Sequence, residues 1–440
     1  MSDIIVLKQG LDVPVSGAAD LRVSKVMSPK NVAVQPLAKG LLPRLLVKEG
    51  DHVLCGSPVI ADKKNPDILL TAPVSGTVKE IVRGEKRKLL AVLIESDGKR
   101  ECAKIDTADV KKALLASGLW PLLVQRPYGI LADPELTPKA IFVSAFNSAP
   151  LAADTEFTLG GEFQSVQKGI EALATLAPVH VGVDASRKSV FEALGSCTVH
   201  RFKGKHPAGN VGVQISHVSP ILKGQTVWTV SLAGVSAIGK LFATGKYDIR
   251  RKVAIGGPAA IEPSYVETLP GTPVSEFAAY YGGSTEGLRL VNGSVLSGAA
   301  VSPDGYLAPD TDQFTIIREG TEKELLGWIN PLRFNQFSHD RSYFSWLRPR
   351  HKWDMDTNLH GGPRPFLMNE NYYKKVLPID IFPIFLTKAC LAGDIEKMEK
   401  YGIYEVLPED LALCEFVDPS KNYIQDIIAQ GIDLMLKEMA

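Results

Sequence analysis

Two stretches near the N-terminus decide the fold of the first domain: VKEGDHVLCGSPV (47–59) and APVSGTVKEI (72–81). Each sets short apolar runs beside turn signals such as Gly50-Asp51 and Ser75-Gly76, which is typical of short strands joined by tight turns. Runs and turns of the same kind fill residues 35–97. The sequence therefore predicts an all-β domain over residues 35–100, preceded by an N-terminal segment of residues 1–34.

This layout, with a long hairpin between the two stretches, resembles the lipoyl and biotinyl domains, which are barrel-sandwich hybrids. In carrier members of that fold, a modified Lys lies at the tip of the hairpin. Here Asn65 occupies that position, with Lys63 and Lys64 beside it. The resemblance thus implies a structural hairpin, while a free-standing lipoyl-type carrier or biotin acceptor remains an alternative.

The next region alternates between strand and helix patterns. AIFVSAF (140–146) and VHVGV (179–183) have the continuous apolar pattern of buried strands, and the apolar spacing from Val166 to Leu176 predicts a helix between them. KSVFEALG (188–195) predicts a short helix that ends at its glycine. This alternation predicts a parallel, doubly wound sheet in a Rossmann-like α/β domain over residues 101–249. Three further segments are strand candidates: CTVHRF (197–202), VGVQIS (211–216) and VWTVSL (227–232).

The last two regions differ again. Residues 250–330 predict the order strand, strand, helix, strand, which is typical of a β-grasp domain of the SLBB kind, with the helix over 273–281. Residues 331–440 predict a C-terminal helical domain, whose clearest helices run from 394 to 401 and from 421 to 439. The fold class is therefore α/β and β, in several domains.

One glycine-rich stretch imitates a nucleotide-binding motif. Residues 234–240, GVSAIGK, fit the P-loop pattern GxxxxGK directly after a predicted strand. However, Leu241 follows where a working P-loop needs Ser or Thr to hold magnesium. The stretch therefore predicts an ordinary helix with a glycine at a packing point.

Composition excludes several classes of function. Lys and Arg number 49, as do Asp and Glu, so the net charge is zero. A neutral chain has no global attraction for nucleic acid or for an anionic membrane surface, and such a contact would need a local patch. The five cysteines include no CxxC pair, which excludes a zinc ribbon or an iron–sulfur cluster held by a local run. Histidines at metal-site spacing are also absent, so no metal site is predicted.

The chain shows no sign of export or of membrane insertion. Its N-terminus lacks the regions of a signal peptide, and no run reaches the ~20 apolar residues that a membrane span needs. The best candidate, residues 376–386, is interrupted by Pro378, Asp380 and Pro383. We therefore expect a cytoplasmic chain that does not itself cross a membrane.

The order of the modules, and many stretches along the whole chain, resemble the A subunit of the sodium-translocating NADH:quinone oxidoreductases (the NqrA family). The stretches that carry the resemblance are GLDVPVSG (10–17), VKEGDHVLCG (47–56), APVSGTVKEIVRGEKRKLL (72–90), AIFVSAFNSAPLAAD (140–154), KGKHPAGNVGVQISHVSP (203–220), NGSVLSG (292–298), MDTNLHGGPRPF (355–366) and YGIYEVLPEDLALCEFVDPSK (401–421).

The resemblance implies a peripheral bacterial subunit on the cytoplasmic face of the inner membrane. The complex would oxidise NADH, reduce ubiquinone or menaquinone and export Na⁺, whereas the isolated chain would not be catalytic. Its partners would be the membrane-embedded B subunit of the complex and the C, D, E and F subunits, with no nucleic acid. FMN, FAD, riboflavin and the Fe–S centre are expected in those partners, and this chain is expected to bind none of them.

The same relationship extends to RnfC and to the flavoprotein subunit of respiratory complex I. Those relatives carry FMN on a glycine-rich loop and iron–sulfur cysteines near the C-terminus. Here the corresponding loop, RPYGILADPELTP (126–138), has a single glycine, and Cys414 has no second cysteine nearby. A loop with one glycine does not cradle a phosphate through successive backbone amides, and one thiolate does not hold a cluster.

A Rossmann-like pocket without FMN suggests a contribution to the quinone site. The predicted lining residues are Arg126, Tyr128, Asn147, Pro150 and His206. Two other interpretations stay open: a purely structural chain that braces the B subunit, and an RnfC-like flavoprotein. The stretch PIDIFPIFL (378–386) is either a docking surface or a buried core.

Overall fold

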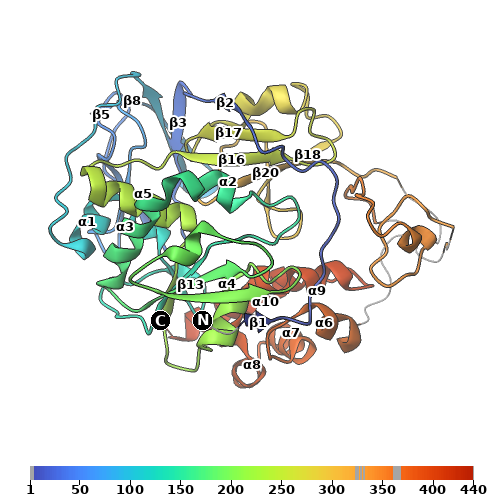
Figure 1. Cartoon of the computed structure of the whole chain (residues 1–440). Coiled ribbons are helices and arrows are strands. Elements are labelled where there is room, and N and C mark those ends of the chain that lie inside the picture. The colour runs from blue at the N-terminus through green and yellow to red at the C-terminus, as the bar shows by residue number, and fades with distance from the viewer. Residues whose placement is uncertain (1–3, 323–326, 328–329, 331, 360–367, 440) are drawn as a thin grey trace.

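The computed structural model describes residues 4–322, 327, 330, 332–359 and 368–439 of the 440-residue chain. The described strands form four sheets, and helices gather around one of the sheets and at the C-terminus (Figure 1). The fold class is the predicted one: a barrel-sandwich hybrid, an α/β domain, a β-grasp domain and a helical C-terminus. Of the family stretch 355–366, residues 360–366 lie outside the described part.

The barrel-sandwich hybrid consists of a four-stranded sheet in the order β3-β9-β8-β5 and a three-stranded sheet in the order β4-β6-β7. Gly76 is required at the start of β8, because a Cβ there would lie 2.0 Å from the carbonyl oxygen of Glu95 on β9. The core residues of this domain include Val32, Val59, Ile60, Val78 and Ile94. The strands are β3 (Asn31–Val34), β4 (Pro43–Leu45), β5 (His52–Val53), β6 (Pro58–Asp62), β7 (Leu69–Thr71), β8 (Gly76–Arg83) and β9 (Leu89–Ser96).

The hairpin between β6 and β7 is built as a structural turn. The backbone N–H of Asn65 donates to Asp62 Oδ2 at 2.8 Å, and the Asn65 side chain accepts from the backbone N–H of Asp67 at 3.3 Å. These local bonds satisfy the turn's own backbone groups, as Asx turns commonly do.

The α/β domain is built on a sheet in the order β1-β14-β13-β12-β15-β10-β11, in which β1 (Ile4–Val6) and β12 to β15 run parallel. Alternate residues of β12 face opposite layers: Ile141 and Val143 pack against α3 and α5, and Phe142 packs against α4. Helices on both faces make the sheet doubly wound, as predicted. The elements are α1 (Val110–Ser117), β10 (Val124–Arg126), β11 (Ile130–Leu131), β12 (Ile141–Ser144), α2 (Thr155–Leu159), α3 (Phe163–Ala174), β13 (Val179–Asp184), β14 (Thr198–Lys203), α4 (Val211–Val218), β15 (Val227–Thr229) and α5 (Leu232–Thr244).

One strand prediction in this domain is wrong. Residues 211–216 form most of helix α4, not a strand. Short apolar runs do not distinguish strand from helix by periodicity alone. The parallel strands β14 and β15 also need a crossover connection, and α4 supplies it. The short helix predicted over 188–195 is a 3₁₀ turn, Val190–Ala193.

The stretch that imitates a P-loop lies inside helix α5, as predicted, and its glycine serves packing. A Cβ on Gly239 would lie 1.7 Å from the carbonyl oxygen of Ser165, at the start of α3. Gly169 on α3 has the reciprocal role, since a Cβ there would lie 2.1 Å from the carbonyl oxygen of Val235. The two helices therefore approach as closely as their backbones allow.

The β-grasp domain has a six-stranded sheet in the order β19-β18-β20-β16-β17-β2, whose last strand, β2 (Val23–Val26), comes from the N-terminal segment. The predicted helix over 273–281 is a 3₁₀ helix, Val274–Tyr280, which buries Phe277 against Phe314 of the sheet. The strands are β16 (Arg251–Gly256), β17 (Ser264–Thr268), β18 (Leu288–Asn292), β19 (Ala299–Val301) and β20 (Gln313–Arg318).

The N-terminal segment 1–34 is shared among the three domains. Its strand β1 (Ile4–Val6) pairs with β14 of the α/β sheet, and β2 (Val23–Val26) pairs with β17 of the β-grasp sheet. Strand β3 then pairs with β9 of the barrel-sandwich hybrid. The segment thus connects three sheets before the first domain is complete.

The C-terminal helices pack around a core that they share with the N-terminal segment and the α/β domain, which contribute Leu7, Phe202 and Val213 to it. The helix predicted over 394–401 is α8, for which Asp394 is the N-cap and which Gly402 ends in the left-handed conformation. Helix α10 begins three residues later than predicted, because Lys421 has a φ of 53° that a right-handed helix excludes. The helices are α6 (Glu370–Val376), α7 (Pro383–Ala392), α8 (Ile395–Tyr401), α9 (Ala412–Val417) and α10 (Ile424–Met439).

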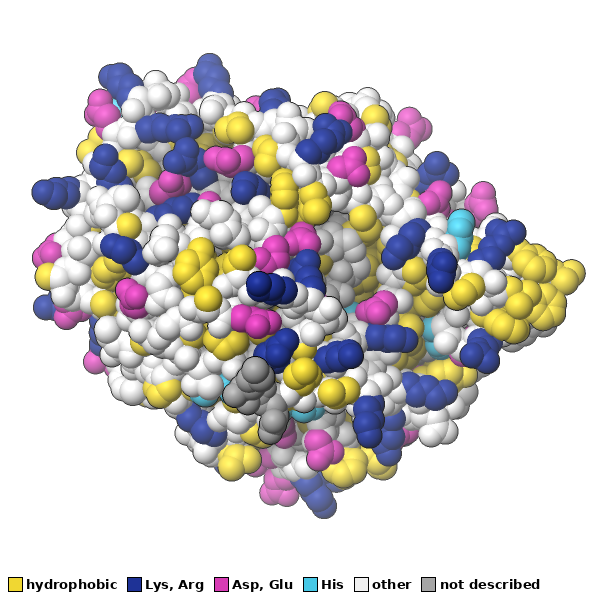
Figure 2. Space-filling model, in the orientation of Figure 1, with side chains coloured by type: hydrophobic (Ala, Val, Ile, Leu, Met, Phe, Trp, Pro, Cys, Tyr) yellow, Lys and Arg dark blue, Asp and Glu magenta, His cyan; other side chains and the backbone are white. Residues whose placement is uncertain are grey.

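The stretch 378–386 leads into α7 and is largely core. Ile379, Ile381 and Leu386 are buried, while Phe382 and Phe385 stay exposed. No helix in the described residues is both long and apolar enough to pass through a bilayer. Residues 332–359 form a loop-rich lobe at one side of the molecule, where apolar side chains gather at the surface (Figures 1 and 2).

Candidate functional site

A cavity of about 650 Å³ lies where the barrel-sandwich hybrid, the α/β domain and the β-grasp domain meet. Ser144, Phe146 and Asn147 reach it from the carboxyl end of β12, and Thr229 and Ser231 from the carboxyl end of β15. The strand order reverses here, because β13 and β14 lie on one side of β12 and β15 lies on the other. Such a switch point is where open α/β sheets bind their ligands.

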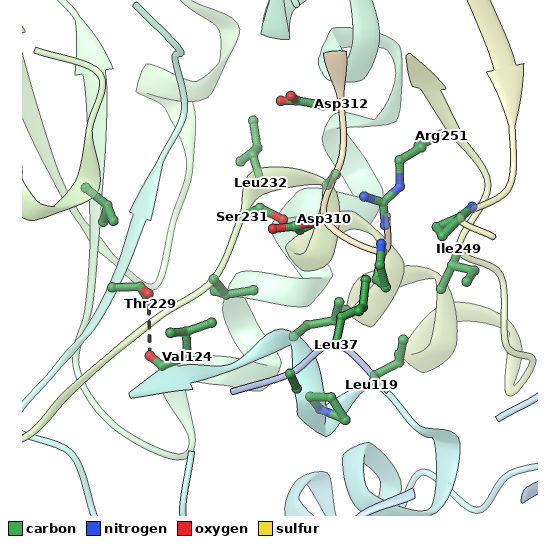
Figure 3. A pocket seen from close by; sticks show the side chains of 18 of the residues that line it. Leu37, Leu119, Val124, Thr229, Ser231, Leu232, Ile249, Arg251, Asp310 and Asp312 are labelled. Carbon is green, nitrogen blue, oxygen red and sulfur yellow. Dashed lines mark hydrogen bonds between the residues drawn. The ribbon is translucent and has the colours of Figure 1, made fainter. Parts of the chain in front are cut away.

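The walls of the cavity are predominantly apolar (Figure 3). Leu37 and Ala38 come from the loop after β3, and Leu70 comes from β7. The α/β domain contributes further apolar side chains, namely Leu119, Leu122, Val124, Ile130 and Leu232. A large apolar pocket with a few polar groups is the usual form of a small-molecule site.

The polar group that stands out in this lining is Arg251, at the start of β16. Its side chain points into the cavity beside Asp310 (Figure 3) and is 7% exposed. Its Nε is buried without a hydrogen-bond partner, and no hydrogen bond or ion pair joins the guanidinium to another described residue. Burial lowers the pKa of Arg251, against the opposing pull of Asp310 and Asp312. A buried donor without a partner is costly, which makes it a candidate ligand contact.

The start of helix α5 adds donors near the same space. Ser231, the N-cap, and the next two residues line the cavity, and the Ser231 hydroxyl accepts from the backbone N–H of Gly234 at 3.1 Å. The first N–H groups of a helix have no intrahelical partners and carry partial positive charge. Together with Arg251, they favour an oxygen acceptor on a ligand.

A second arginine of the cavity, Arg126, is paired within the chain. Its Nη1 lies 2.8 Å from Asp410 Oδ2, and its Nη2 lies 3.0 Å from Glu409 Oε1. Burial opposes the charge of Arg126, but the two carboxylates outweigh it and raise its pKa. The Asp410 carboxylate also abuts the first turn of α4, where a Cβ on Gly212 would lie 2.3 Å from Oδ2. The C-terminal region therefore places a carboxylate, that of Asp410, between Arg126 and the start of α4.

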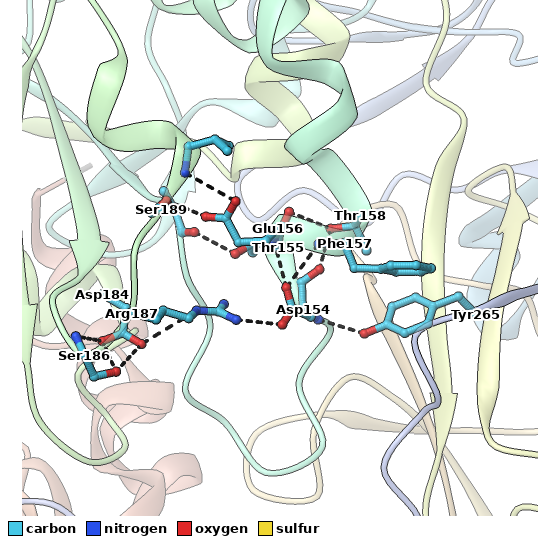
Figure 4. Close-up of polar contacts among 12 residues, drawn as sticks. Asp154, Thr155, Glu156, Phe157, Thr158, Asp184, Ser186, Arg187, Ser189 and Tyr265 are labelled. Carbon is cyan, nitrogen blue, oxygen red and sulfur yellow. Dashed lines mark hydrogen bonds and ion pairs between the residues drawn. The ribbon is translucent and has the colours of Figure 1, made fainter.

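A polar network fixes helix α2, whose Thr155 and Thr158 line the cavity (Figure 4). Asp154 caps this helix and accepts from Arg187 Nη1 at 2.7 Å. The backbone N–H of Asp154 donates to the hydroxyl of Tyr265 on β17 at 2.8 Å. The network thus joins the α/β domain to the β-grasp sheet, and it holds one wall of the cavity in place.

The structure separates the five residues predicted for the site. Arg126 and Asn147 line the cavity. Tyr128 packs edge-on against Tyr404 of the C-terminal region instead, with ring centroids 6.1 Å apart. The carbonyl of Pro150 accepts from Gln313 Nε2 at 2.9 Å. Neither Tyr128 nor Pro150 is among the residues that line the cavity.

His206 also lies outside the lining. It is 4% exposed, and its Nδ1 lies 3.0 Å from the hydroxyl of Ser148. Burial lowers the pKa of His206 to about 4, against a smaller opposing effect of Asp12 and Asp410. The imidazole is therefore neutral near pH 7 and acts as a buried hydrogen-bonding group.

The sequence gives little indication that Arg251 and Ser231 line a cavity. Arg251 lies at the start of a predicted strand. Ser231 lies just before the predicted helix whose residues 234–240 imitate a P-loop. The apolar lining comes from three domains that meet only in the folded chain. The one usable signal was the N-cap Ser231 at the carboxyl end of a parallel strand, where ligand sites concentrate.

Comparison with known families covers most of the chain. Residues 5–97 match the NqrA N-terminal barrel-sandwich hybrid domain, and residues 105–247 match the NqrA second alpha/beta domain. Residues 252–302 match the NqrA C-terminal domain of the SLBB type.

Full-length relatives agree with these matches. The A subunit of the Na(+)-translocating NADH-quinone reductase of Yersinia pestis bv. Antiqua is 37% identical, over 97% of this chain and 99% of the relative. The subunit of the same name from Actinobacillus succinogenes is 36% identical, over 99% of this chain and 100% of the relative. That of Pasteurella multocida is 34% identical over the same shares.

Proposed function

Because the chain belongs to the NqrA family, the A subunit of the Na⁺-translocating NADH-quinone reductases, we propose that its cavity binds quinone and contributes to the quinone site of that complex. The relatives are subunits of an oxidoreductase complex, so the chain acts within an assembly of several subunits. A quinone is a flat ring with two carbonyl acceptors and an apolar tail, and the cavity offers groups for both.

The observation that carries this proposal is the buried guanidinium of Arg251, which has no hydrogen-bonded partner among the described residues and faces a largely apolar space. It would donate to one quinone carbonyl, and the start of α5 at Ser231 would add backbone donors nearby. Leu119, Leu122 and Val124 would contact the ring and the first part of the tail. A hydrogen bond that satisfies a buried charged donor contributes more than an exposed one.

We also propose that this chain holds no flavin and no iron–sulfur centre, so that FMN, FAD, riboflavin and the Fe–S centre belong to partner subunits. The single glycine of the loop, Gly129, faces the C-terminal region, since a Cβ there would lie 3.0 Å from the Leu407 side chain. The Asp410 carboxylate occupies the anion position at the start of α4. A flavin phosphate would have to displace this internal anion from Arg126.

The proposal includes the place of the chain in the assembly. It would be a peripheral subunit on the cytoplasmic face of the bacterial inner membrane, next to the membrane-embedded B subunit, with the C, D, E and F subunits completing the complex. Electrons would enter and leave through the partners' cofactors, and this chain would hold the quinone. The alternative is a purely structural role, in which the chain braces the B subunit without binding quinone.

Equilibrium binding of a short-chain ubiquinone, or of a short-chain menaquinone analogue, to the purified chain tests the proposal. We expect saturable binding that Arg251→Gln weakens at least tenfold. Arg250→Gln is the matched control. Arg250 is the next residue in the sequence, but its guanidinium pairs with Asp248 at 2.6 Å and it does not line the cavity. Absence of saturable binding, with normal assembly into the complex, would support the purely structural role. Photolabelling with an azido-quinone should mark peptides that contain Leu119 or Val124.

A further inference from the structure

The lobe of residues 332–359 carries an unusual exposed apolar surface. Leu332 is 68% exposed, Leu347 is 60% exposed and Trp346 is 43% exposed, and Phe334 and Phe344 are exposed beside them. Trp346 and Leu347 belong to a single 3₁₀ turn, Phe344–Leu347, that presents both side chains outward. Figure 2 shows apolar side chains gathered at this projecting edge of the molecule. Clusters of exposed apolar side chains of this kind mark sites at which a protein contacts another protein or a membrane.

Cations surround this apolar tip. Arg341, Arg348, Arg350 and Lys352 are all exposed, and the only carboxylate near them on the tip is Asp340. The lobe's other two carboxylates, Asp354 and Asp356, follow Trp353 at the base. None of the four cations forms an ion pair with another described residue, and Arg341 lies 5.4 Å from the centre of the Trp346 ring. The chain as a whole is neutral, so this is the local basic patch that a contact with an anionic surface requires.

The lobe is fixed to the rest of the molecule at its base. The backbone N–H of buried Trp353 donates to the carbonyl of Pro14 at 2.7 Å, and the carbonyl of Trp353 accepts from Ser16 at 3.0 Å. Inside the lobe, the guanidinium of buried Arg333 lies 5.5 Å from the centre of the Tyr343 ring. The base therefore orients the tip outward.

We propose that this tip is a membrane anchor that places Trp346, Leu347 and Phe344 at the headgroup boundary of an anionic lipid bilayer. Tryptophan and leucine suit that boundary, and the surrounding arginines and lysine attract acidic headgroups while their alkyl stems lie along the apolar zone. The tip is a projection on which exposed cations outnumber carboxylates, which fits a flat anionic surface. This anchor is independent of the proposed quinone site.

Sedimentation of the purified full chain with lipid vesicles tests the anchor. We expect binding to vesicles of equal parts phosphatidylcholine and phosphatidylglycerol, and at least tenfold weaker binding to phosphatidylcholine alone. The double variant Trp346→Ser/Leu347→Ser should lose at least tenfold in affinity, and Arg348→Gln/Arg350→Gln/Lys352→Gln should lose most of the salt dependence. Phe382→Ser/Phe385→Ser is the matched control, because it removes another exposed aromatic pair and should bind normally.

A spectroscopic measurement separates insertion from loose attraction. Brominated lipid should quench tryptophan fluorescence of the bound chain, and Trp346→Phe should remove that quenching while vesicle binding persists. The proposal would be overturned by a chain that ignores anionic vesicles, or by unchanged binding of Trp346→Ser/Leu347→Ser. It would also be overturned if a partner protein shielded Trp346 in the detergent-solubilised complex, since the tip would then be a protein interface.

Discussion

Two arginines line the same cavity, and their surroundings differ completely. Arg126 is 2% exposed and bonds to Asp410 and Glu409 of the C-terminal region, whereas Arg251 is 7% exposed and has no bonded partner among the described residues. Burial alone therefore does not reveal what a charged side chain does. The pair of Arg126 belongs to the architecture, because it joins segments 284 residues apart. Arg251 is the one of the two that remains available to a ligand.

A third buried basic group, His206, responds to burial in another way. It is neutral near pH 7 and bonds to the uncharged hydroxyl of Ser148 instead of to a carboxylate, because burial lowers its pKa to about 4. Burial thus has a different result for each of the three side chains. Arg126 pairs with carboxylates, Arg251 stays charged and can bind a ligand, and His206 becomes neutral. Each outcome has a different consequence when the side chain is changed.

The largest effect is expected at Arg126. Arg126→Leu would leave the Asp410 carboxylate, which is 2% exposed, buried without its cation. Breaking a buried pair from one side costs about 3–5 kcal/mol of unfolding free energy. Urea unfolding of the purified chain measures the loss. The double variant Arg126→Leu/Asp410→Leu should recover most of it, and a single variant within about 1 kcal/mol of the parent would contradict the pair's structural role.

The next effect depends on pH through His206. Its pKa falls from 6.5 in the unfolded chain to about 4 in the folded one, so between these values the unfolded chain binds the extra proton. Stability from this group is present above pH 6.5 and is lost as pH falls toward 4, by up to about 3 kcal/mol. Unfolding curves across this range should show a shallower decline for His206→Gln than for the parent. The exposed His52→Gln serves as control, and parallel curves for His206→Gln and the parent would refute the assignment.

A smaller effect, on binding and not on stability, is expected at Arg251. Arg251→Gln should weaken short-chain quinone binding about ten- to hundredfold, since a hydrogen bond to a charged donor contributes about 1.5–3 kcal/mol. The variant should unfold at a urea concentration close to that of the parent, because it removes a buried guanidinium that has no hydrogen-bonded partner but also the positive charge that favours the ionised form of buried Asp312. Calorimetric titration and urea unfolding on one preparation test both parts. A marked loss of stability would mean that Arg251, like Arg126, stabilises the fold, and the proposed difference between the two arginines would be refuted.

The sequence allowed the domains to be recognised but not the contacts between them. The turn residues of the two N-terminal stretches and the strand pattern of AIFVSAF (140–146) are local signals, and they led to the correct fold class. Arg126 lines the cavity, but its partner Asp410 lies far along the chain and no periodicity links them. The helix at 211–216 was missed because its identity depends on the crossover between two strands. Arg251 was missed because its burial arises only where three domains meet.

The smallest effect is expected at Glu409, the other carboxylate on Arg126. Its side chain is 42% exposed, whereas that of Asp410 is fully buried, although both bond to the same guanidinium. Water screens an exposed partner, so Glu409→Gln should change the unfolding free energy by less than about 1 kcal/mol. Asp410→Asn should lose several times as much, because it leaves the buried cation with its weaker, solvent-exposed partner alone. Urea unfolding of the two variants side by side measures this ratio. Equal losses would mean that water screens Glu409 and Asp410 to the same degree. Arg126 and Arg251 would then differ in whether each guanidinium has a bonded partner, and not in how burial affects that partner.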